Sequence, residues 1–298
     1  MIPVTIRQLT YFVAVAEHGG TAQAAQALNV SQPAISLAIK QLEETLGQSL
    51  FVRRHAQGLI LTALGRQKLS EARFLLTQTN AWATSPEGGR HEGWVDIGCF
   101  VTLGPSHMPS IIRGFRQELP GIHVRLREAN IEQLHDLLET GSVEAALMYD
   151  LNLARGVNLE AVGELRPHVL VSADHHLATR ARVSLREIAE QPFILINLPH
   201  SREYFLSLFR LVGITPSIVM ESQSLEMVRG MVANGQGVSM LVTRPHSEMS
   251  YDGRRLVSLE IEEAVPAQKV VIATSRQYPM TWMAHAFVRH VREHFSLL

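Results

Sequence analysis

The sequence is poor in three features, and each shortage excludes a class of protein. It has one cysteine among 298 residues, Cys99, so no disulfide can form within the chain. Apolar runs such as Phe193–Ile196 have the length of a strand, far below the roughly 20 residues that a membrane-spanning helix needs. Residues 1–11 lack the basic region and apolar block of a secretory signal. These absences predict a cytoplasmic protein that does not enter a membrane.

The composition is that of a globular protein with a charge difference along its length. With 46% apolar residues, 298 residues are enough for two domains with sizeable cores. The net charge of -1 hides an excess of Arg and Lys over Glu, six against three, between Met1 and Lys68. A basic N-terminal module predicts an anionic partner such as nucleic acid, although a merely solvated surface would have the same composition.

The first 62 residues predict a helix-turn-helix followed by a hairpin. Helical spacing of apolar residues predicts helices over residues 9–16, 22–28 and 32–46. Ser31 is expected to cap the third helix, and Pro33 lies in its first turn, where a missing N–H costs nothing. The joint Asn29-Val30 is short enough to make the last two helices a helix-turn-helix. Two short strands, 50–53 and 59–62, predict a wing with Arg53 and Arg54 near its tip.

A long helix and a hinge are expected next. Residues 63–83 contain no proline and have a narrow apolar seam, which favours packing against a second helix and therefore a dimer. Ser85–Gly89 reads Ser-Pro-Glu-Gly-Gly, a composition typical of a hinge between domains.

Strands and helices alternate in the remainder of the chain. Alternation predicts parallel sheets covered by helices, here two α/β lobes with a ligand cleft at the carboxyl ends of the strands. The expected strands are 94–98, 122–128, 145–149, 169–172, 193–197, 218–220, 237–241 and 270–274. The expected helices are 107–118, 131–140, 185–189, 202–211, 225–233 and 280–295.

At the N-terminus the sequence resembles the LysR-type transcriptional regulators. The resemblance is carried by Arg7-Gln8-Leu9, Tyr11-Phe12, Ala24-Ala25, Leu28–Ser36, Leu42-Glu43, Leu46-Gly47, Leu50–Arg54, Leu61-Thr62 and Gly65. The order of the remaining elements resembles the effector-binding domain of that family, which is similar to periplasmic binding proteins. The resemblance implies a winged helix-turn-helix over residues 1–62, a linker helix and hinge over 63–90, and an effector-binding domain over 91–298. Its two Rossmann-like lobes would comprise 91–162 with 266–298, and 163–265.

The recognition helix of such a motif places its N-terminal residues in the major groove of DNA. There Gln32 can pair with adenine, Ser36 can bind a base or a phosphate, and Lys40 is expected at a phosphate. The expected DNA-contacting residues are Thr21, Ser31, Gln32, Pro33, Ser36, Lys40, Arg53 and Arg54. The alternative is that Ser31 only caps its helix and that the wing arginines are only solvated.

Two departures from the family pattern bear on DNA binding. Relatives usually have Phe-Thr where this chain has Thr21-Ala22, so the capping hydroxyl is expected to move back to Thr21. Relatives often have Arg at the position of Leu37. The loss of this cation predicts an unusual operator preference or a lower affinity.

Effector residues are predicted in loops that precede helices. Thr102 and the pair Ser201-Arg202 are expected to bind a polar head at two helix N-termini that face each other across the cleft. The resemblance implies that Phe100, Asn130, Met148, Tyr149 and Thr243 line the same cleft. Capping or core packing would explain each residue equally well. The sequence therefore predicts a small organic carboxylate with an apolar portion as effector.

Two other functional classes stay open. Cys99 or the methionines Met148, Met227, Met231 and Met240 would suit a redox-responsive regulator, although buried packing is the ordinary role of both residue types. His290–His294 spells the His-x-x-Glu-His pattern of some zinc peptidases, but no third ligand is evident. The expectation is a non-enzymatic homodimeric or homotetrameric regulator that binds double-stranded promoter DNA and an effector, and that needs no cofactor or structural metal.

Overall fold

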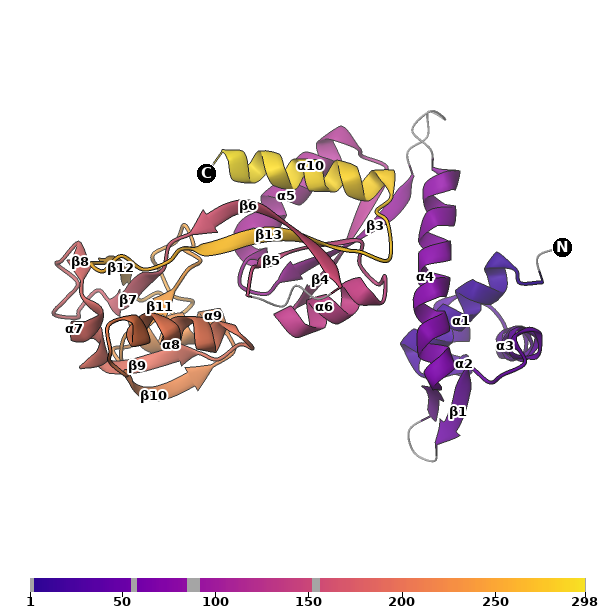
Figure 1. The fold of residues 1–298 in the computed structure, drawn as a ribbon, viewed down its shortest axis with the longest axis horizontal. Coiled ribbons are helices and arrows are strands. Elements are labelled where there is room, and N and C mark those ends of the chain that lie inside the picture. The colour runs from indigo at the N-terminus through magenta and orange to yellow at the C-terminus, as the bar shows by residue number, and fades with distance from the viewer. Residues whose placement is uncertain (1–2, 55–57, 85–91, 152–155, 298) are drawn as a thin grey trace.

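The computed structural model describes residues 3–54, 58–84, 92–151 and 156–297. Within these ranges a helical N-terminal domain, one long helix and two α/β lobes follow one another across the molecule (Figure 1). The predicted tip of the wing at 55–57 and the predicted hinge at Ser85–Gly89 lie outside the described residues. No helix in the described ranges is both long and apolar enough to cross a membrane.

Local signals set the limits of the first three helices. Thr5 and Gln8 form a capping box that starts the first helix, and Gly19 and Gly47 end the first and third in the left-handed conformation, with φ of 72° and 69°. The helices are α1 (Ile6–His18), α2 (Thr21–Ala27) and α3 (Gln32–Leu46). They share one core, which includes Phe12, Val15, Ala24, Ile35, Leu42, Leu50 and Phe51.

The predicted hairpin follows α3. Strand β1 (Phe51–Arg54) pairs antiparallel with β2 (Gly58–Leu61), and the ring of Phe51 contacts that of Phe12 edge to face at 5.5 Å between centroids. Thr62 then caps the next helix, because its Oγ1 accepts a hydrogen bond from the Gly65 amide at 2.9 Å. The hairpin is therefore packed against the helical core.

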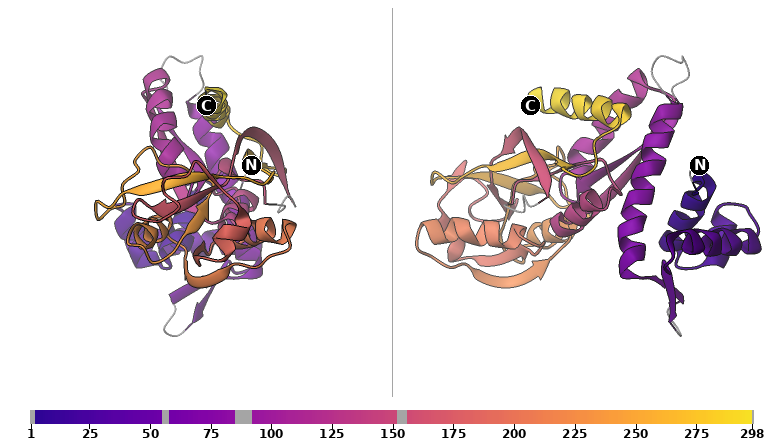
Figure 2. Two further views of the ribbon diagram at one scale, coloured as in Figure 1. Left: turned by 90° about the vertical axis from the view of Figure 1, so that its left-hand side faces the viewer. Right: turned by 45° about the vertical axis from the view of Figure 1, so that its right-hand side comes forward.

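The long helix α4 (Ala63–Ala83) stands between the N-terminal domain and the first lobe (Figure 2). It contacts both sides, since Arg73 lies 3.1 Å from Glu17 of α1 and donates to Ser142 Oγ of the first lobe at 2.6 Å. Trp82, by contrast, is 81% exposed on α4.

Lobe I is built on a five-stranded sheet in the order β4-β3-β5-β13-β6. Its central strands β3 and β5 are buried almost throughout, which explains their nearly continuous apolar sequence. Its elements are β3 (Gly93–Phe100), α5 (Gly104–Glu118), β4 (Ile122–Ala129), α6 (Ile131–Glu139), β5 (Ala145–Tyr149), β6 (Val157–Leu165), β13 (Gln268–Ser275) and α10 (Trp282–Ser296).

Lobe II contains a parallel pair, β10-β9, and a four-stranded sheet in the order β11-β7-β12-β8. A bridge between Phe193 and Val238 joins the two parts. Its elements are β7 (His168–Ser172), β8 (Arg182–Val183), α7 (Leu185–Ala189), β9 (Pro192–Ile196), α8 (Ser201–Leu211), β10 (Ser217–Ser222), α9 (Leu225–Ala233), β11 (Ser239–Leu241) and β12 (Leu256–Ile261).

The prediction of purely parallel sheets was wrong. Only β4-β3-β5 of the large sheet are parallel, because the chain crosses between the lobes twice and returns as β13, which runs antiparallel to both β5 and β6. The alternation pattern also missed β6, β8 and β12. Strands β6 and β8 lie at the edges of their sheets, whereas β12 lies between β7 and β8. All three contain exposed or half-buried residues, which give no continuous apolar run.

Candidate DNA interface and interlobe pocket

Helix α3 has one side in the core and one side in solvent. Ile35 and Ile39 are buried, whereas Gln32, Ser36 and Lys40 are exposed. Because these three residues are spaced four apart, they lie along one face of the helix. The face therefore offers an amide, a hydroxyl and an ammonium group in a row, which are the groups that bind base edges and phosphates.

The amide of Gln32 is held from the neighbouring helix. Its Nε2 donates to Thr21 Oγ1 at 3.2 Å, which leaves a second N–H and the Oε1 acceptor unused by this bond. The predicted capping role of Thr21 was wrong, since Gly20 occupies the N-cap of α2. Ser31 occupies the predicted N-cap of α3, but its side chain makes no capping hydrogen bond. Pro33 lies exposed in the first turn, as expected.

The predicted cations differ in how fully the structure describes them. Lys40 Nζ lies 3.7 Å from Glu44 Oε1, and both side chains are largely exposed. Arg53 is exposed on β1, whereas the side chain of Arg54 lies outside what the structure describes. Leu37 is 57% exposed on α3, so an apolar side chain occupies this part of the helix surface.

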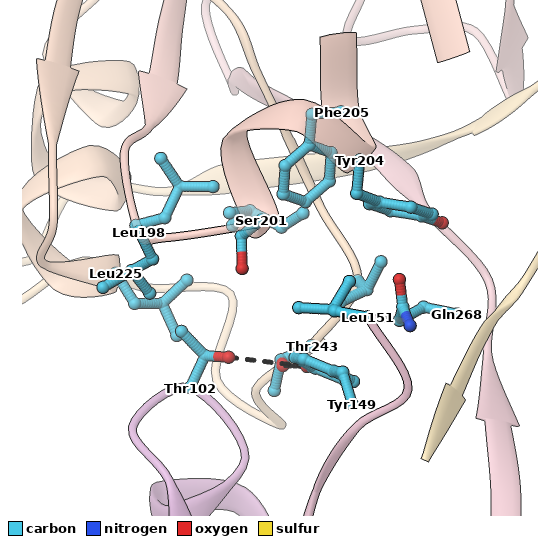
Figure 3. A pocket seen from close by; sticks show the side chains of 13 residues that line it. Thr102, Tyr149, Leu151, Leu198, Ser201, Tyr204, Phe205, Leu225, Thr243 and Gln268 are labelled. Atoms are coloured by element: carbon cyan, nitrogen blue, oxygen red, sulfur yellow. Dashed lines mark hydrogen bonds between the residues drawn. The ribbon is translucent and has the colours of Figure 1, made fainter. Parts of the chain in front are cut away.

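A narrow pocket lies between the two lobes (Figure 3). Its polar groups come from five places in the chain: Thr102 before α5, Tyr149 at the end of β5, Ser201 at the start of α8, Thr243 after β11 and Gln268 at the start of β13. The apolar wall consists of Leu151, Ile196, Leu198, Tyr204, Phe205, Leu225, Leu241 and Val242.

Three hydroxyl groups connect the lobes at this pocket. Tyr149 OH lies 2.8 Å from Thr243 Oγ1 and accepts a longer bond from Thr102 Oγ1 at 3.5 Å. Burial raises the pKa of Tyr149 to about 12, against the opposing effect of both threonine bonds, so the phenol keeps its proton at neutral pH. The pocket thus contains uncharged hydrogen-bonding groups that can rearrange when a ligand enters.

None of the side chains that line this pocket in the described structure is charged. Arg202, the predicted cation of the site, is not among the lining residues. Its guanidinium lies 3.4 Å from Glu203 and 3.4 Å from Glu221. The sequence identified the correct loop, but Glu203 of the same helix and Glu221 of β10 hold this arginine outside the pocket.

Four of the predicted effector residues meet at the pocket, namely Thr102, Tyr149, Ser201 and Thr243. Ser201 is buried and begins α8, while His200 occupies the N-cap position with a φ of 63°, so the alternative that Ser201 merely caps α8 is wrong.

The other three predicted lining residues lie elsewhere. Phe100 is fully buried and packs edge to face on Tyr149 at 5.2 Å between ring centroids, which places it behind the pocket. Asn130 caps α6 through a capping box with Gln133. Met148 is buried within β5. Because alternate residues of a strand face opposite ways, Tyr149 and Met148 cannot both point into one cavity.

Family models match both parts of the chain. Residues 6–66 match the bacterial regulatory helix-turn-helix protein model of the lysR family, and residues 88–296 match the LysR substrate binding domain. The chain belongs to the LysR family of transcriptional regulators. The winged domain with its exposed α3 is therefore the DNA-binding domain of a LysR regulator, and the two lobes are its effector-binding domain.

Known LysR proteins resemble the chain over most of its length. HinK, a LysR family transcriptional regulator from Pseudomonas aeruginosa, is 38% identical, with 99% of this chain and 100% of that one covered and a TM-score of 0.67. The uncharacterized regulator YnfL of Escherichia coli is 31% identical over 88% of this chain and 90% of its own. A hydrogen peroxide-inducible genes activator of Dickeya chrysanthemi is 26% identical over 99% and 97%.

Most of the apolar wall of this LysR pocket escaped the sequence analysis. Val242 directly follows β11, whereas Leu151 and Leu198 lie two residues beyond the ends of β5 and β9. The rule that ligands bind beyond the carboxyl ends of strands was the available signal for them. Gln268 had no such signal, since it lies at the start of β13 and is brought in by the second crossover.

The cysteine of this regulator is poorly placed for redox sensing. Cys99 is fully buried in β3, and its Sγ contacts the carbonyl of Phe100 at 3.6 Å. Burial, with a smaller contribution from the charge of Glu128, raises the pKa of the thiol far above its usual range. Of the named methionines, Met148 and Met240 are buried, and Met227 is 56% exposed.

The two histidines of the peptidase-like pattern have different partners. His290 Nε2 lies 2.9 Å from Glu118 Oε2, whereas His294 Nε2 lies 3.1 Å from His107 Nδ1. Within the described ranges, the one group of three potential metal ligands within 4.8 Å is His135, Asp136 and Glu139, which includes neither histidine. The arrangement of a zinc peptidase, with both histidines converging on one ion, is therefore not formed.

Proposed function

We propose that this LysR regulator reads its operator with the exposed face of α3. The row Gln32, Ser36 and Lys40 carries the proposal, because it combines a bidentate amide with groups that suit phosphate. Gln32 contacts a base edge, with Thr21 holding its amide, while Ser31, Pro33 and Ser36 approach the same groove. Lys40 and the wing residues Arg53 and Arg54 bind the phosphate backbone.

The proposed effector is a small organic carboxylate with an apolar portion. The hydroxyls of Ser201 and Thr102 support this class, since they lie where the N-termini of α8 and α5 add partial positive charge. No side chain forms a capping hydrogen bond at the start of either helix. The apolar wall around Leu198 and Phe205 suits the remainder of the ligand.

Effector binding would act through the hydrogen bond between the lobes. Tyr149 belongs to lobe I and Thr243 to lobe II, so a polar head that competes for either hydroxyl changes what holds the lobes together. A ligand shifts the equilibrium between two lobe arrangements only by its difference in affinity for them. The arrangement favoured by the ligand then alters the spacing of the DNA-binding domains through α4.

The proposed assembly is a homodimer, or a homotetramer made of two dimers. Leu75 and Trp82 are 49% and 81% exposed on α4, and large apolar side chains on an otherwise soluble helix suit a partner helix. A second copy of α4 would bury them.

Calorimetric titration of carboxylates and their neutral amides tests the effector proposal. We expect the acids to bind, and Ser201→Ala to weaken them about tenfold or more, because a charge-assisted hydrogen bond contributes roughly 1.5 to 3 kcal/mol. Arg202→Ala is the matched control on the adjacent residue. We expect it to change affinity by less than about fivefold, since its guanidinium is exposed and paired with glutamates.

Three results decide this experiment. An amide that binds as tightly as its acid would refute the carboxylate class. A larger loss in Arg202→Ala than in Ser201→Ala would show that the arginine turns into the pocket. Thermal unfolding of each variant separates a lost contact from a lost fold.

A further inference from the structure

A second, larger groove spans the lobes beside the effector pocket. It shares only Val242 and Thr243 with that pocket and is otherwise lined from α5, α10 and β6 of lobe I and from β8, β12 and the segment after β11 of lobe II. Three histidines line it: His107 of α5, His294 of α10 and His246, which follows β11. Neither the family match nor the proposed effector accounts for this grouping.

We propose that His107 and His294 bind one divalent transition-metal ion in this groove, with solvent in the remaining coordination positions. The distance carries the inference. His107 Nδ1 and His294 Nε2 are 3.1 Å apart, although they come from residues 187 positions apart in the sequence. Two nitrogens each about 2.0–2.1 Å from a zinc ion lie roughly 3.3 Å apart at a tetrahedral angle. The pair therefore needs only a tilt of the rings to accept an ion.

The neighbouring hydrogen bonds fix which nitrogen of His294 carries its proton. Ser110 Oγ donates its single hydrogen to the carbonyl of His107 at 2.9 Å, so it can only accept from His294 Nδ1, which lies 3.5 Å away. His294 Nε2 is then the bare nitrogen, and His107 Nδ1 donates to it. Metal binding requires the His107 proton to move from Nδ1 to Nε2 through solvent. His107 Nδ1 and His294 Nε2 then each offer a lone pair to the ion, and the net charge of the protein is unchanged.

Packing and chemistry narrow the class of ion. The ring of Phe295 lies 4.8 Å from that of His107 between centroids and limits its rotation. Imidazole ligands select zinc, nickel, cobalt or copper ions over magnesium and calcium, which prefer oxygen. The charged side chains that line the groove balance, so the imidazoles and not a net acidic charge would hold the ion; they are Arg166, Arg182, Arg244, Glu164, Glu260 and Glu263.

The metal site does not depend on the effector pocket being correctly assigned, because both ligands belong to lobe I and neither of them lines that pocket.

Metal titration of the untagged full-length protein tests the proposal. Zinc and cobalt ions are added to the wild type in a calorimeter, and the visible absorption of bound cobalt reports histidine ligation. We expect one ion per chain, and a loss of about 10- to 100-fold in affinity or more in His107→Gln and in His294→Gln. His246→Gln changes the third histidine that lines the groove and is expected to keep the wild-type affinity, because the pair on lobe I binds the ion.

Two control variants separate this site from its neighbours. His290→Gln removes another histidine of α10, whose partner is Glu118, and His135→Gln breaks the group with Asp136 and Glu139. Both should bind metal as the wild type does. Undiminished binding in the double variant of His107 and His294, or loss of binding in His135→Gln alone, would overturn the proposal. So would a wild type that binds no transition metal. Because His107 is buried, its replacement can also destabilise the fold, so each variant must keep the wild-type melting temperature. His294 is half-buried, and His294→Gln is therefore the variant that decides the test.

Discussion

At the residue scale, the sequence predicted which loops carry polar groups but not the direction in which each side chain points. Ser201 and Arg202 are neighbours, but one hydroxyl lines the pocket and one guanidinium pairs with Glu203 and Glu221. The sequence placed both at the start of a helix. It contained no sign that β10 would bring Glu221 beside the arginine.

The same scale gives a prediction for DNA recognition. Gln32→Ala should weaken discrimination at one base pair by about 1 to 3 kcal/mol, because the amide is the one exposed side chain in the first turn of α3 that suits bidentate base contact. Lys40→Ala should weaken binding to all sequences alike and reduce the salt slope by about one. Titrations of matched and mutated operators at several salt concentrations distinguish these effects.

Gln41→Ala is the control for this prediction, since Gln41 is also an exposed glutamine of α3 but lies near its middle, beside α1. It should leave operator preference unchanged. An equal loss on every operator in Gln32→Ala would remove Gln32 from base readout.

At the scale of elements, helices were easier to predict than strands. The limits of α1, α3 and α4 follow from local signals: an apolar repeat, a polar cap and, for α1 and α3, a terminal glycine. Strands depend on partners far away in the sequence. Residues 157–165 of β6 became a strand because β13 arrives beside them more than a hundred residues later. No local pattern in Val157–Leu165 predicted that pairing.

The joint between the wing and α4 allows an element-scale prediction. A Cβ added at Gly65 would lie 2.1 Å from the carbonyl oxygen of Leu50, which already accepts the amide of Thr62 at 2.9 Å. Backbone cannot move away cheaply, so Gly65→Ala should separate α4 from the hairpin. We expect operator binding to fall about tenfold or more through destabilisation of the winged domain by several kcal/mol.

Gly230→Ala is the matched control, because Gly230 is also a helical glycine and its added Cβ would meet nothing within 4 Å. Alanine loses less backbone entropy on folding than glycine does, so Gly230→Ala should stabilise that lobe by about 0.5 to 1 kcal/mol. Urea unfolding followed separately by operator binding and by effector binding measures both. A Gly65→Ala protein with wild-type operator affinity would contradict the account of this joint.

At the scale of the whole molecule, the long helix links the two functions. Arg73 of α4 contacts Glu17 of the DNA-binding domain and Ser142 of lobe I, and Trp282 of α10 donates to the carbonyl of Ala81 at 3.3 Å. One side chain thus touches both domains within the chain. A change in the arrangement of the lobes can therefore reach α1 through Arg73.

Arg73→Ala should weaken the coupling between effector and operator more than either affinity alone. The loss is expected to be about 0.5 to 1 kcal/mol of coupling free energy, the range of a half-exposed ion pair. Operator titrations with and without a carboxylate that binds the wild type measure it. Lys68→Ala is the control, because the partner of Lys68 is Glu71 on the same helix. Equal coupling in wild type and Arg73→Ala would exclude this route.

The sequence by itself determined the winged helix-turn-helix, the long helix and the loops that meet at the pocket. These depend on interactions within a few residues: caps, turns and periodic apolar positions. Tertiary structure alone decided the antiparallel return of β13, the neutral lining of the pocket and the pairing of His107 with His294. Each of the three joins segments more than 40 residues apart, and their meeting is set by how the lobes cross and pack. A local pattern carries no information about that crossing.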